Sequence, residues 1–244
     1  MHLRCLQKNL VVTQEIVRDI LSLLDPEGYH NKGPNYLWHT DSYDKLKPYG
    51  ICINGCIDGY SRHIIWMRVG PTSSDPKVVA GYFVSAMRMV GGCPKTLRSD
   101  MGTENKIIEH IQRTFHTLFN TDRSEKPPYI YGKSTHNQRI EAWWSMLRKH
   151  CSQFWMNLFQ SLKDDNDFEG GILDKLLMQF YYINRVILEW NAHKISKSRN
   201  SISPTERPTV LYEIPSWCGT VVSLVHVRTY IWNSHVDIYI RFVT

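Results

Sequence analysis

The sequence has few of the residues that build metal-thiolate sites or disulfide frameworks. Its six cysteines include no Cys-x-x-Cys pair and no cluster with histidine at the spacing that zinc requires. We therefore expect no zinc site. Cys52 and Cys56 fall on one face of an apolar run, where small buried residues are the ordinary interpretation. Reduced cysteines of this kind are typical of an intracellular protein.

Long hydrophobic runs are also missing. Near the N-terminus the only apolar group is Leu10-Val11-Val12, which is too short for the core of a signal peptide. The apolar segment 221–243 is interrupted by His226, Arg228, Asn233, His235, Asp237 and Arg241. These polar and charged side chains would make insertion into a bilayer costly. We expect a soluble protein that has no membrane partner.

The sequence contains neither an internal repeat nor a low-complexity segment. Its 244 residues are 42% hydrophobic, which is enough to form a globular core. The 29 lysines and arginines exceed the 23 aspartates and glutamates, which gives a net charge of +6. This charge favours a polyanionic partner, although composition alone leaves open whether one exists.

Three consecutive strands are predicted in the first part of the core. Apolar runs at 36–44, 49–57 and 63–69 are separated by the turn signals Lys47-Pro48-Tyr49-Gly50 and Asp58-Gly59-Tyr60-Ser61. Short turns between neighbouring strands predict an antiparallel meander.

A helix and a returning strand follow the meander. Asp75 is a predicted N-cap, Pro76 fits the first helical position, and Gly91-Gly92 marks the end of the helix. Residues 96–99 then form a short strand. Because a strand, a crossover helix and a return strand make a right-handed unit, we expect this strand to lie parallel to an earlier one.

Three further helices are predicted, at 104–118, 137–162 and 172–191, with a polar loop at 120–128 between the first two. The second helix has an apolar seam that indicates a core or partner contact. The seam consists of Ile140, Trp144, Leu147, Cys151, Phe154, Leu158 and Leu162.

The two ends of the chain are predicted to form small elements. A short helix at 13–24 fits either a DNA-binding or dimerising unit or a packing appendage. Segments 221–232 and 236–243 are rich in β-formers but too short for an independent barrel. The chain therefore divides into an N-terminal segment 1–34, a core 35–207 and a C-terminal tail 208–244.

Three acidic residues in distinctive surroundings suggest a metal site. Asp41 and Asp100 lie where strand-like runs meet turn residues, and Glu141 lies at the start of the helix predicted at 137–162. Three converging carboxylates would repel one another unless hard cations neutralised them, so the pattern favours Mg²⁺ or Mn²⁺. Such sites commonly perform phosphoryl chemistry.

The sequence resembles the catalytic core of retroviral integrases and related DDE transposases in five motifs that follow one another in the same order. They are Trp-His-x-Asp at 38–41, Asp-Gly-Tyr-Ser-Arg at 58–62, Ser-Asp-x-Gly-Thr-Glu at 99–104, Asn-Gln-Arg-Ile-Glu at 137–141, and Trp-Asn-Ala-His at 190–193 followed by Ser203-Pro204. The resemblance implies an α/β, RNase H-like fold. This fold has a five-stranded mixed sheet flanked by helices, here with a helical extension and a short β-rich tail.

The resemblance also implies a function for the three acids. Asp41, Asp100 and Glu141 would hold two Mg²⁺ or Mn²⁺ ions that align a water or 3′-hydroxyl for in-line attack on a DNA phosphodiester. A homo-oligomer and a nuclear location fit such an activity. Basic and polar residues around Glu141 would contact DNA phosphates without reading sequence. These are Lys133, His136, Asn137, Arg139, Arg148 and Lys149.

Alternatives remain open at this point. Asp44 could replace Asp41, whereas Asp58 is expected to cap its turn and Glu104 to lie in the first turn of a helix. The zinc-binding domain that precedes many integrase cores has no counterpart in the sequence. The protein could therefore be a domesticated, catalytically inactive nucleic-acid-binding module, or an oligomeric scaffold that uses the seam of helix 137–162.

Overall fold

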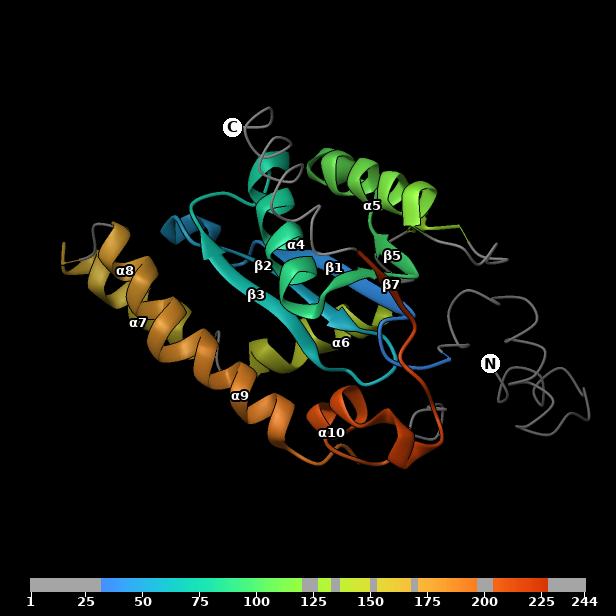
Figure 1. The fold of residues 1–244 in the computed structure, drawn as a ribbon. Coiled ribbons are helices and arrows are strands. Elements are labelled where there is room, and N and C mark those ends of the chain that lie inside the picture. The colour runs from blue at the N-terminus through green and yellow to red at the C-terminus, as the bar shows by residue number, and fades with distance from the viewer. Residues whose placement is uncertain are drawn as a thin grey trace, which may run out of the picture.

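A mixed five-stranded sheet forms the centre of the protein, as the computed structural model shows (Figure 1). The structure describes residues 32–119, 127–132, 137–149, 153–167, 171–196 and 204–227. The strand order is β3-β2-β1-β5-β6. The strands are β1 (Leu37–Tyr43), β2 (Cys52–Asp58), β3 (Ile64–Gly70), β5 (Thr96–Ser99) and β6 (Tyr129–Tyr131).

The sheet has the predicted topology. β1, β2 and β3 pair antiparallel, while β5 lies parallel to β1 and β6 parallel to β5. Helix α4 (Pro76–Val90) makes the crossover from β3 to β5. Asp75 caps this helix by accepting a hydrogen bond from the Lys77 N–H, and Gly91 ends it with φ 78°. The α/β, RNase H-like fold expected from the sequence is thus confirmed.

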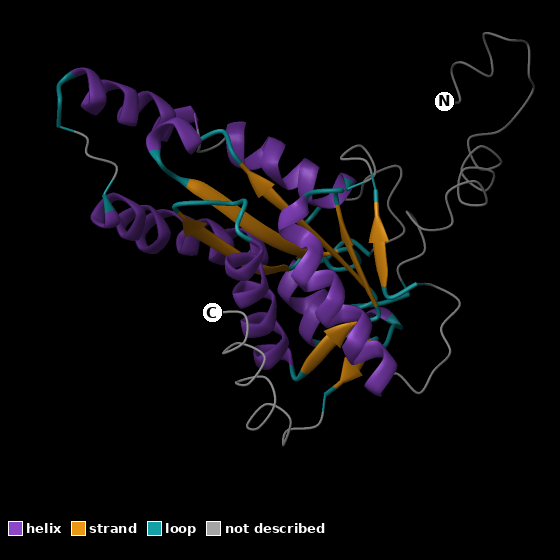
Figure 2. Ribbon diagram, turned by 90° about the horizontal axis from the view of Figure 1, so that it is seen from above, coloured by secondary structure: helices purple, strands orange, loops and turns teal. Residues whose placement is uncertain are grey.

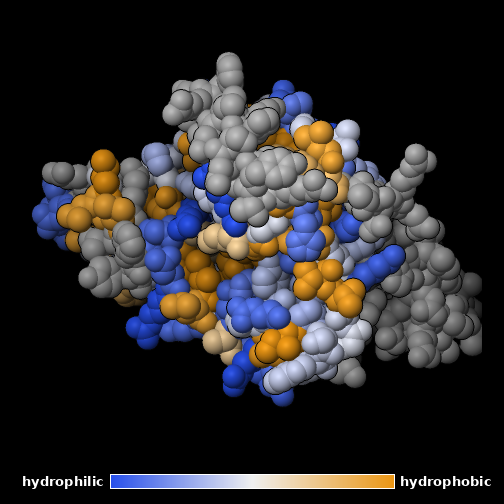
Figure 3. All heavy atoms as spheres, in the orientation of Figure 1, coloured by the Kyte–Doolittle hydropathy of each residue, from blue (hydrophilic) through white to orange (hydrophobic). Residues whose placement is uncertain are grey.

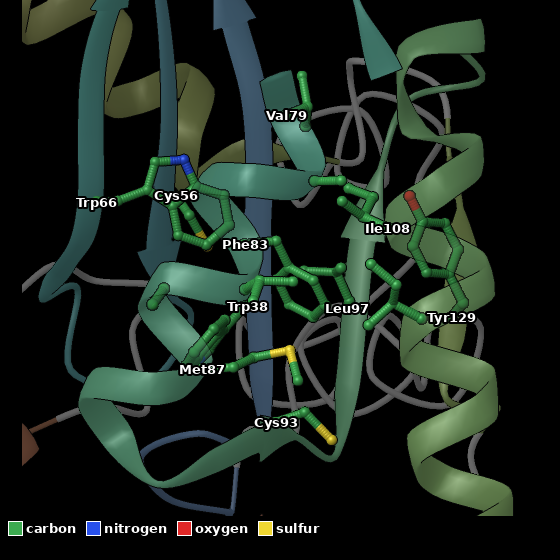
Figure 4. Packing of buried hydrophobic residues seen from close by; sticks show 14 of the residues in the cluster. Trp38, Cys56, Trp66, Val79, Phe83, Met87, Cys93, Leu97, Ile108 and Tyr129 are labelled. Atoms are coloured by element: carbon green, nitrogen blue, oxygen red, sulfur yellow. The ribbon is translucent and has the colours of Figure 1, made fainter. Parts of the chain in front are cut away.

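One face of the sheet packs against α4 and α5 (Lys106–Phe119). A 3₁₀ turn, Thr103–Asn105, precedes α5. Trp38 of β1 lies at the centre of this core, with its ring 6.4 Å from that of Phe83 and 6.2 Å from that of Trp66 (Figure 4). All three side chains are buried. Because alternate residues of a strand point to opposite faces, Trp38 also fixes which β1 residues point the other way.

The opposite face packs against helices of the second half of the chain, and Figure 2 shows helices on both sides of the sheet. Its core combines residues of β2 and β3 with Trp143, Phe159 and Ile183 from helical segments. These segments are α6 (Gln138–Leu147), α7 (Gln153–Asp164), α8 (Ile172–Leu177), a π-helix (Met178–Ile183) and α9 (Asn184–Ala192). The sheet is therefore covered on both faces.

The helix predicted at 137–162 is described in two parts. α6 ends at Leu147 and is followed by π-helical Arg148 and Lys149, and α7 begins at Gln153. Phe154 of the predicted seam is 64% exposed, whereas Phe159 outside the seam is buried. A π-helical turn changes the phase of a helix, so the 3.6-residue repeat of α6 does not extend into α7. Cys151 lies outside the described residues.

The helix predicted at 172–191 is also interrupted. The π-helix between α8 and α9 changes the helical phase, and Leu176 of α8 is 46% exposed. Exposed apolar side chains gather near the outer end of this helical layer (Figure 3). They include Ile172 and Leu173.

The outer edge of β3 is covered by two side-chain amides. The Gln179 carbonyl oxygen accepts the Val69 N–H at 2.7 Å, and the Asn191 carbonyl oxygen accepts the Ile64 N–H at 2.9 Å. Both amides come from the π-helix and α9. These side chains therefore supply hydrogen bonds that a sixth strand would otherwise provide.

Part of the predicted C-terminal tail belongs to the core. Helix α10 (Pro208–Glu213) packs against α9 and is followed by a 3₁₀ turn, Pro215–Cys218. Strand β7 (Leu224–His226) pairs antiparallel with the short β4 (Gly92–Pro94), and Val225 is buried in the core under α4 and α5. The predicted helix 13–24 and strand segment 236–243 lie outside the described residues. No described helix has the length and apolarity needed to cross a membrane.

Candidate active site

Strands β1 and β5 carry two of the three predicted acids on the same face of the sheet. His39 of β1 is paired with Arg98 of β5. Asp41 and Asp100 follow each of these residues by two positions, so alternation directs both carboxylates toward the face that α6 covers. Asp41 lies within β1, while Asp100 comes directly after the last residue of β5.

Helix α6 brings Glu141 to the same face. Its start is fixed to β1 by Asn137, which is 1% exposed. The Asn137 side-chain N–H donates to the Thr40 carbonyl at 2.9 Å, and its carbonyl oxygen lies 2.8 Å from His39 Nδ1. Because Glu141 lies in the first turn of α6, these bonds set its position relative to β1.

Asp41 lies close enough to Asp100 and Glu141 for both charges to act on it. The pKa of Asp41 is raised to about 7, chiefly because the side chain is buried. Hydrogen bonds from the Ser42 backbone and from Trp144 lower this pKa, and the charges of Asp100 and Glu141 raise it further. A cation beside these groups would relieve both the repulsion and the cost of burial.

The donor atoms suit a hard divalent cation, because carboxylate oxygens are the preferred ligands of Mg²⁺ and Mn²⁺. With the side chains in their present orientations, no three His, Cys, Asp or Glu residues of the described segments form a group that could hold one ion. Metal binding by the three acids would therefore require at least one of their side chains to turn toward the others.

Asn105 holds Asp100 in place. The buried Asn105 side-chain N–H₂ donates to Asp100 Oδ1 at 3.0 Å and to Glu104 Oε1 at 3.2 Å. Burial raises the pKa of Glu104, and the charges of Asp100 and Asp44 contribute to the same effect. Glu104 lies in the 3₁₀ turn before α5, close to the position predicted for it.

His39 is a neutral, buried part of this region. Burial lowers its pKa to about 3, and the charges of Arg98 and Arg139 act in the same direction. The Asn137 oxygen can only accept, so His39 Nδ1 carries the proton that it donates. The imidazole thus connects β1 to α6 without adding charge beside the acids.

The basic residues predicted to bind DNA have different environments. Arg148 and Lys149 are exposed and Arg139 is partly buried, so these cations can reach solvent. Asn137 has both amide atoms bonded within the protein, and the phosphate contact expected of it is replaced by a role in positioning α6. Lys133 and His136 lie outside the described residues.

Asp58 is the turn cap that the sequence predicted. It is fully buried and accepts hydrogen bonds from the N–H groups of Asn35 and Ser61 and from the Ser61 hydroxyl. Burial nevertheless raises its pKa to about 6. Asp44, the other rival, accepts a hydrogen bond from the Ser73 hydroxyl at 2.7 Å.

Three supporting residues, His39, Asn105 and Trp144, were not predicted as parts of the site. His39 was detectable, because alternation places it on the same face as Asp41. Trp144 follows Glu141 by three positions and therefore lies on the same side of a helix. Asn105 has no comparable signal, since its contact depends on the path of the turn after Asp100.

The family of the chain follows from a comparison with known proteins. A family model described as an integrase core domain matches residues 28–212. Among solved structures, the chain is similar to the HTLV-2 integrase catalytic core domain in complex with magnesium (trimeric form). That match has 15% sequence identity and a TM-score of 0.42, and covers 75% of this chain and all of the other. A search of curated proteins found no match.

Proposed function

Since the chain belongs to the integrase core domain family, we propose that it is a polynucleotidyl transferase that acts on DNA phosphodiesters at Asp41, Asp100 and Glu141. The observation that carries the proposal is that three acids reach one face of the sheet from β1, the end of β5 and α6, where the charges of Asp100 and Glu141 both act on Asp41. A bound cation would relieve the repulsion that raises the pKa of Asp41.

The proposed cofactor is a pair of Mg²⁺ or Mn²⁺ ions held by the three carboxylates. Such ions supply charge neutralisation, an activated attacking oxygen and stabilisation of the leaving oxygen. The protein contributes the orientation of the ligands. Trp144 donates to Asp41, Asn105 donates to Asp100, and Asn137 fixes the helix that carries Glu141.

Arg139, Arg148 and Lys149 are the proposed contacts to DNA phosphates, together with Lys133 and His136. Arg148 and Lys149 are exposed about two turns along the chain from Glu141, and Arg139 lies two residues before it. Contacts of this type position a duplex and give salt-dependent affinity without sequence preference. A DNA substrate implies a nuclear location, and we propose a homo-oligomer as the active form.

The test uses purified protein with labelled duplex and single-stranded oligonucleotides in Mg²⁺ or Mn²⁺. We expect cleavage or strand transfer that Asp100→Asn reduces by about 100-fold or more, because losing a ligand to the ions removes several kcal/mol of transition-state stabilisation. Asp167→Asn is the matched control, since Asp167 is an exposed acid outside the site. This variant should retain full activity.

Two results would overturn the proposal. One is cleavage that Asp100→Asn leaves unchanged. The other is DNA binding without any metal-dependent cleavage, which would identify the chain as a non-catalytic nucleic-acid-binding member of its family.

A further inference from the structure

Trp144 connects two of the three acids. It lies three residues after Glu141 on α6, and its side chain is 5% exposed. Its indole N–H donates a hydrogen bond to Asp41 Oδ2 at 3.0 Å, across 103 residues of sequence. One buried side chain thus joins the helix that carries Glu141 to the strand that carries Asp41.

Gly55 makes room for this indole ring. Gly55 of β2 is the residue paired with Asp41 of β1. A Cβ atom at Gly55 would lie 2.9 Å from the Trp144 Cη2 atom and 2.9 Å from the Met67 Cε atom. Real Cβ atoms do not approach other atoms so closely, so the ring can occupy this place only because position 55 has no side chain.

The indole ring of Trp144 also packs against Tyr43. Tyr43, which shares a face of β1 with Asp41, has its ring centroid 5.3 Å from that of Trp144. The indole is therefore confined by Tyr43 and by the backbone of β2 at Gly55. Because the ring is confined, its N–H keeps one direction, toward the Asp41 carboxylate.

We propose that Trp144 is a positioning residue that orients the Asp41 carboxylate for a divalent cation and links its position to that of Glu141. The inference rests on the proposed function, because it concerns the same metal site. Indole N–H can donate but cannot accept, so it takes one lone pair of Oδ2, the Ser42 backbone N–H takes another lone pair of the carboxylate, and the rest remain for the cation. It acts on the metal through Asp41 and does not touch the metal itself.

The experiment measures Mn²⁺ binding by isothermal titration calorimetry, which requires no DNA and no turnover. We expect Trp144→Phe to bind Mn²⁺ about 10- to 100-fold more weakly than the wild type, as is typical when a hydrogen-bond partner of a ligand is removed. Trp143→Phe is the matched control. Trp143 is the adjacent tryptophan, is also buried, and donates to the Met67 sulfur instead of a carboxylate.

A second variant tests the same hydrogen bond without removing Trp144. Gly55→Ala should displace the indole ring and weaken Mn²⁺ binding in the same direction, while Trp144 itself is retained. If Trp144→Phe fails to fold, the ¹⁵N–¹H resonance of the wild-type Trp144 indole provides the readout. It should shift on addition of Mg²⁺, whereas the Trp143 resonance should stay in place.

The possible failures can be told apart. The inference is overturned if Trp144→Phe binds Mn²⁺ with the affinity of the wild type. It is also overturned if the wild type binds Mg²⁺ but the Trp144 indole resonance does not shift. Either result leaves the proposed function standing. A wild-type chain that binds no divalent cation would overturn the proposed function, and this inference with it.

Discussion

His63 should make the stability of the fold depend on pH. Its ring stacks on that of Tyr212 in α10, with centroids 4.5 Å apart and an interplanar angle of 10°. Nε2 lies 3.4 Å from the Asn191 amide nitrogen, and the buried Nδ1 has no hydrogen-bond partner among the described residues. Burial lowers the pKa of His63 to about 4. Protonation thus opposes the contact between the start of β3 and the C-terminal helices.

The sign and size of the effect follow from this pKa. An unfolded histidine titrates near 6.5, so the unfolded chain binds the proton first as the pH falls. His63 therefore contributes stability that is fully present above 6.5 and is lost progressively toward about 4. The full difference of some 2.5 pKa units corresponds to about 3 kcal/mol. Between pH 7.5 and 5.0 the loss should be about 2 kcal/mol.

The assay is urea denaturation of the wild type and His63→Phe at pH 7.5 and pH 5.0. Phenylalanine keeps an aromatic ring beside Tyr212 but does not titrate, so its loss of stability over this interval should be about 2 kcal/mol smaller than that of the wild type. His110→Phe, a change at an exposed position of α5, should follow the wild type. Equal pH dependence in His63→Phe and the wild type would refute the reasoning.

Two further substitutions change residues that contact or neighbour the proposed metal ligands. Asn105→Ala should weaken Mn²⁺ binding by about 10-fold, because Asp100 loses a hydrogen-bond donor, and calorimetry with unchanged affinity would contradict this role. Asp58→Asn should lower the free energy of unfolding by about 1–3 kcal/mol, because an amide N–H₂ would face the Ser61 donors. DNA cleavage per folded molecule should survive this change, and its loss in a folded variant would make Asp58 a catalytic candidate.

The parts of the fold that local rules determine were predictable. Alternating apolar residues and short turns were enough for β1, β2 and β3. Asp75, Pro76 and Gly91 marked both ends of α4. The strands β4 and β6 were not predicted, because each has three residues and depends on partners far away in the sequence. The π-helical turns after α6 and between α8 and α9 were missed for a related reason, since each changes a helical phase that periodicity assumes to be constant.

The candidate site also has some residues that local patterns indicate and others that they do not. Asp41, Asp100 and Glu141 could be named as candidates from the sequence because each lies in a recognisable motif at the end or start of a predicted element. The groups that orient them were harder to find. Trp144 looked like one more member of an apolar seam, and only its contact with Asp41 and the space at Gly55 reveal its second role. Such contacts join residues about 90 to 100 positions apart, beyond the reach of local patterns.

The amides of Gln179 and Asn191 at the edge of β3 limit how copies of this protein can associate. An incoming strand would have to displace both side chains to reach the N–H groups of Ile64 and Val69. The incoming strand would have to replace both hydrogen bonds before it added any stability. Growth of the sheet across a subunit boundary is thus disfavoured at this margin. A homo-oligomer of the chain should therefore use surfaces other than this edge of β3.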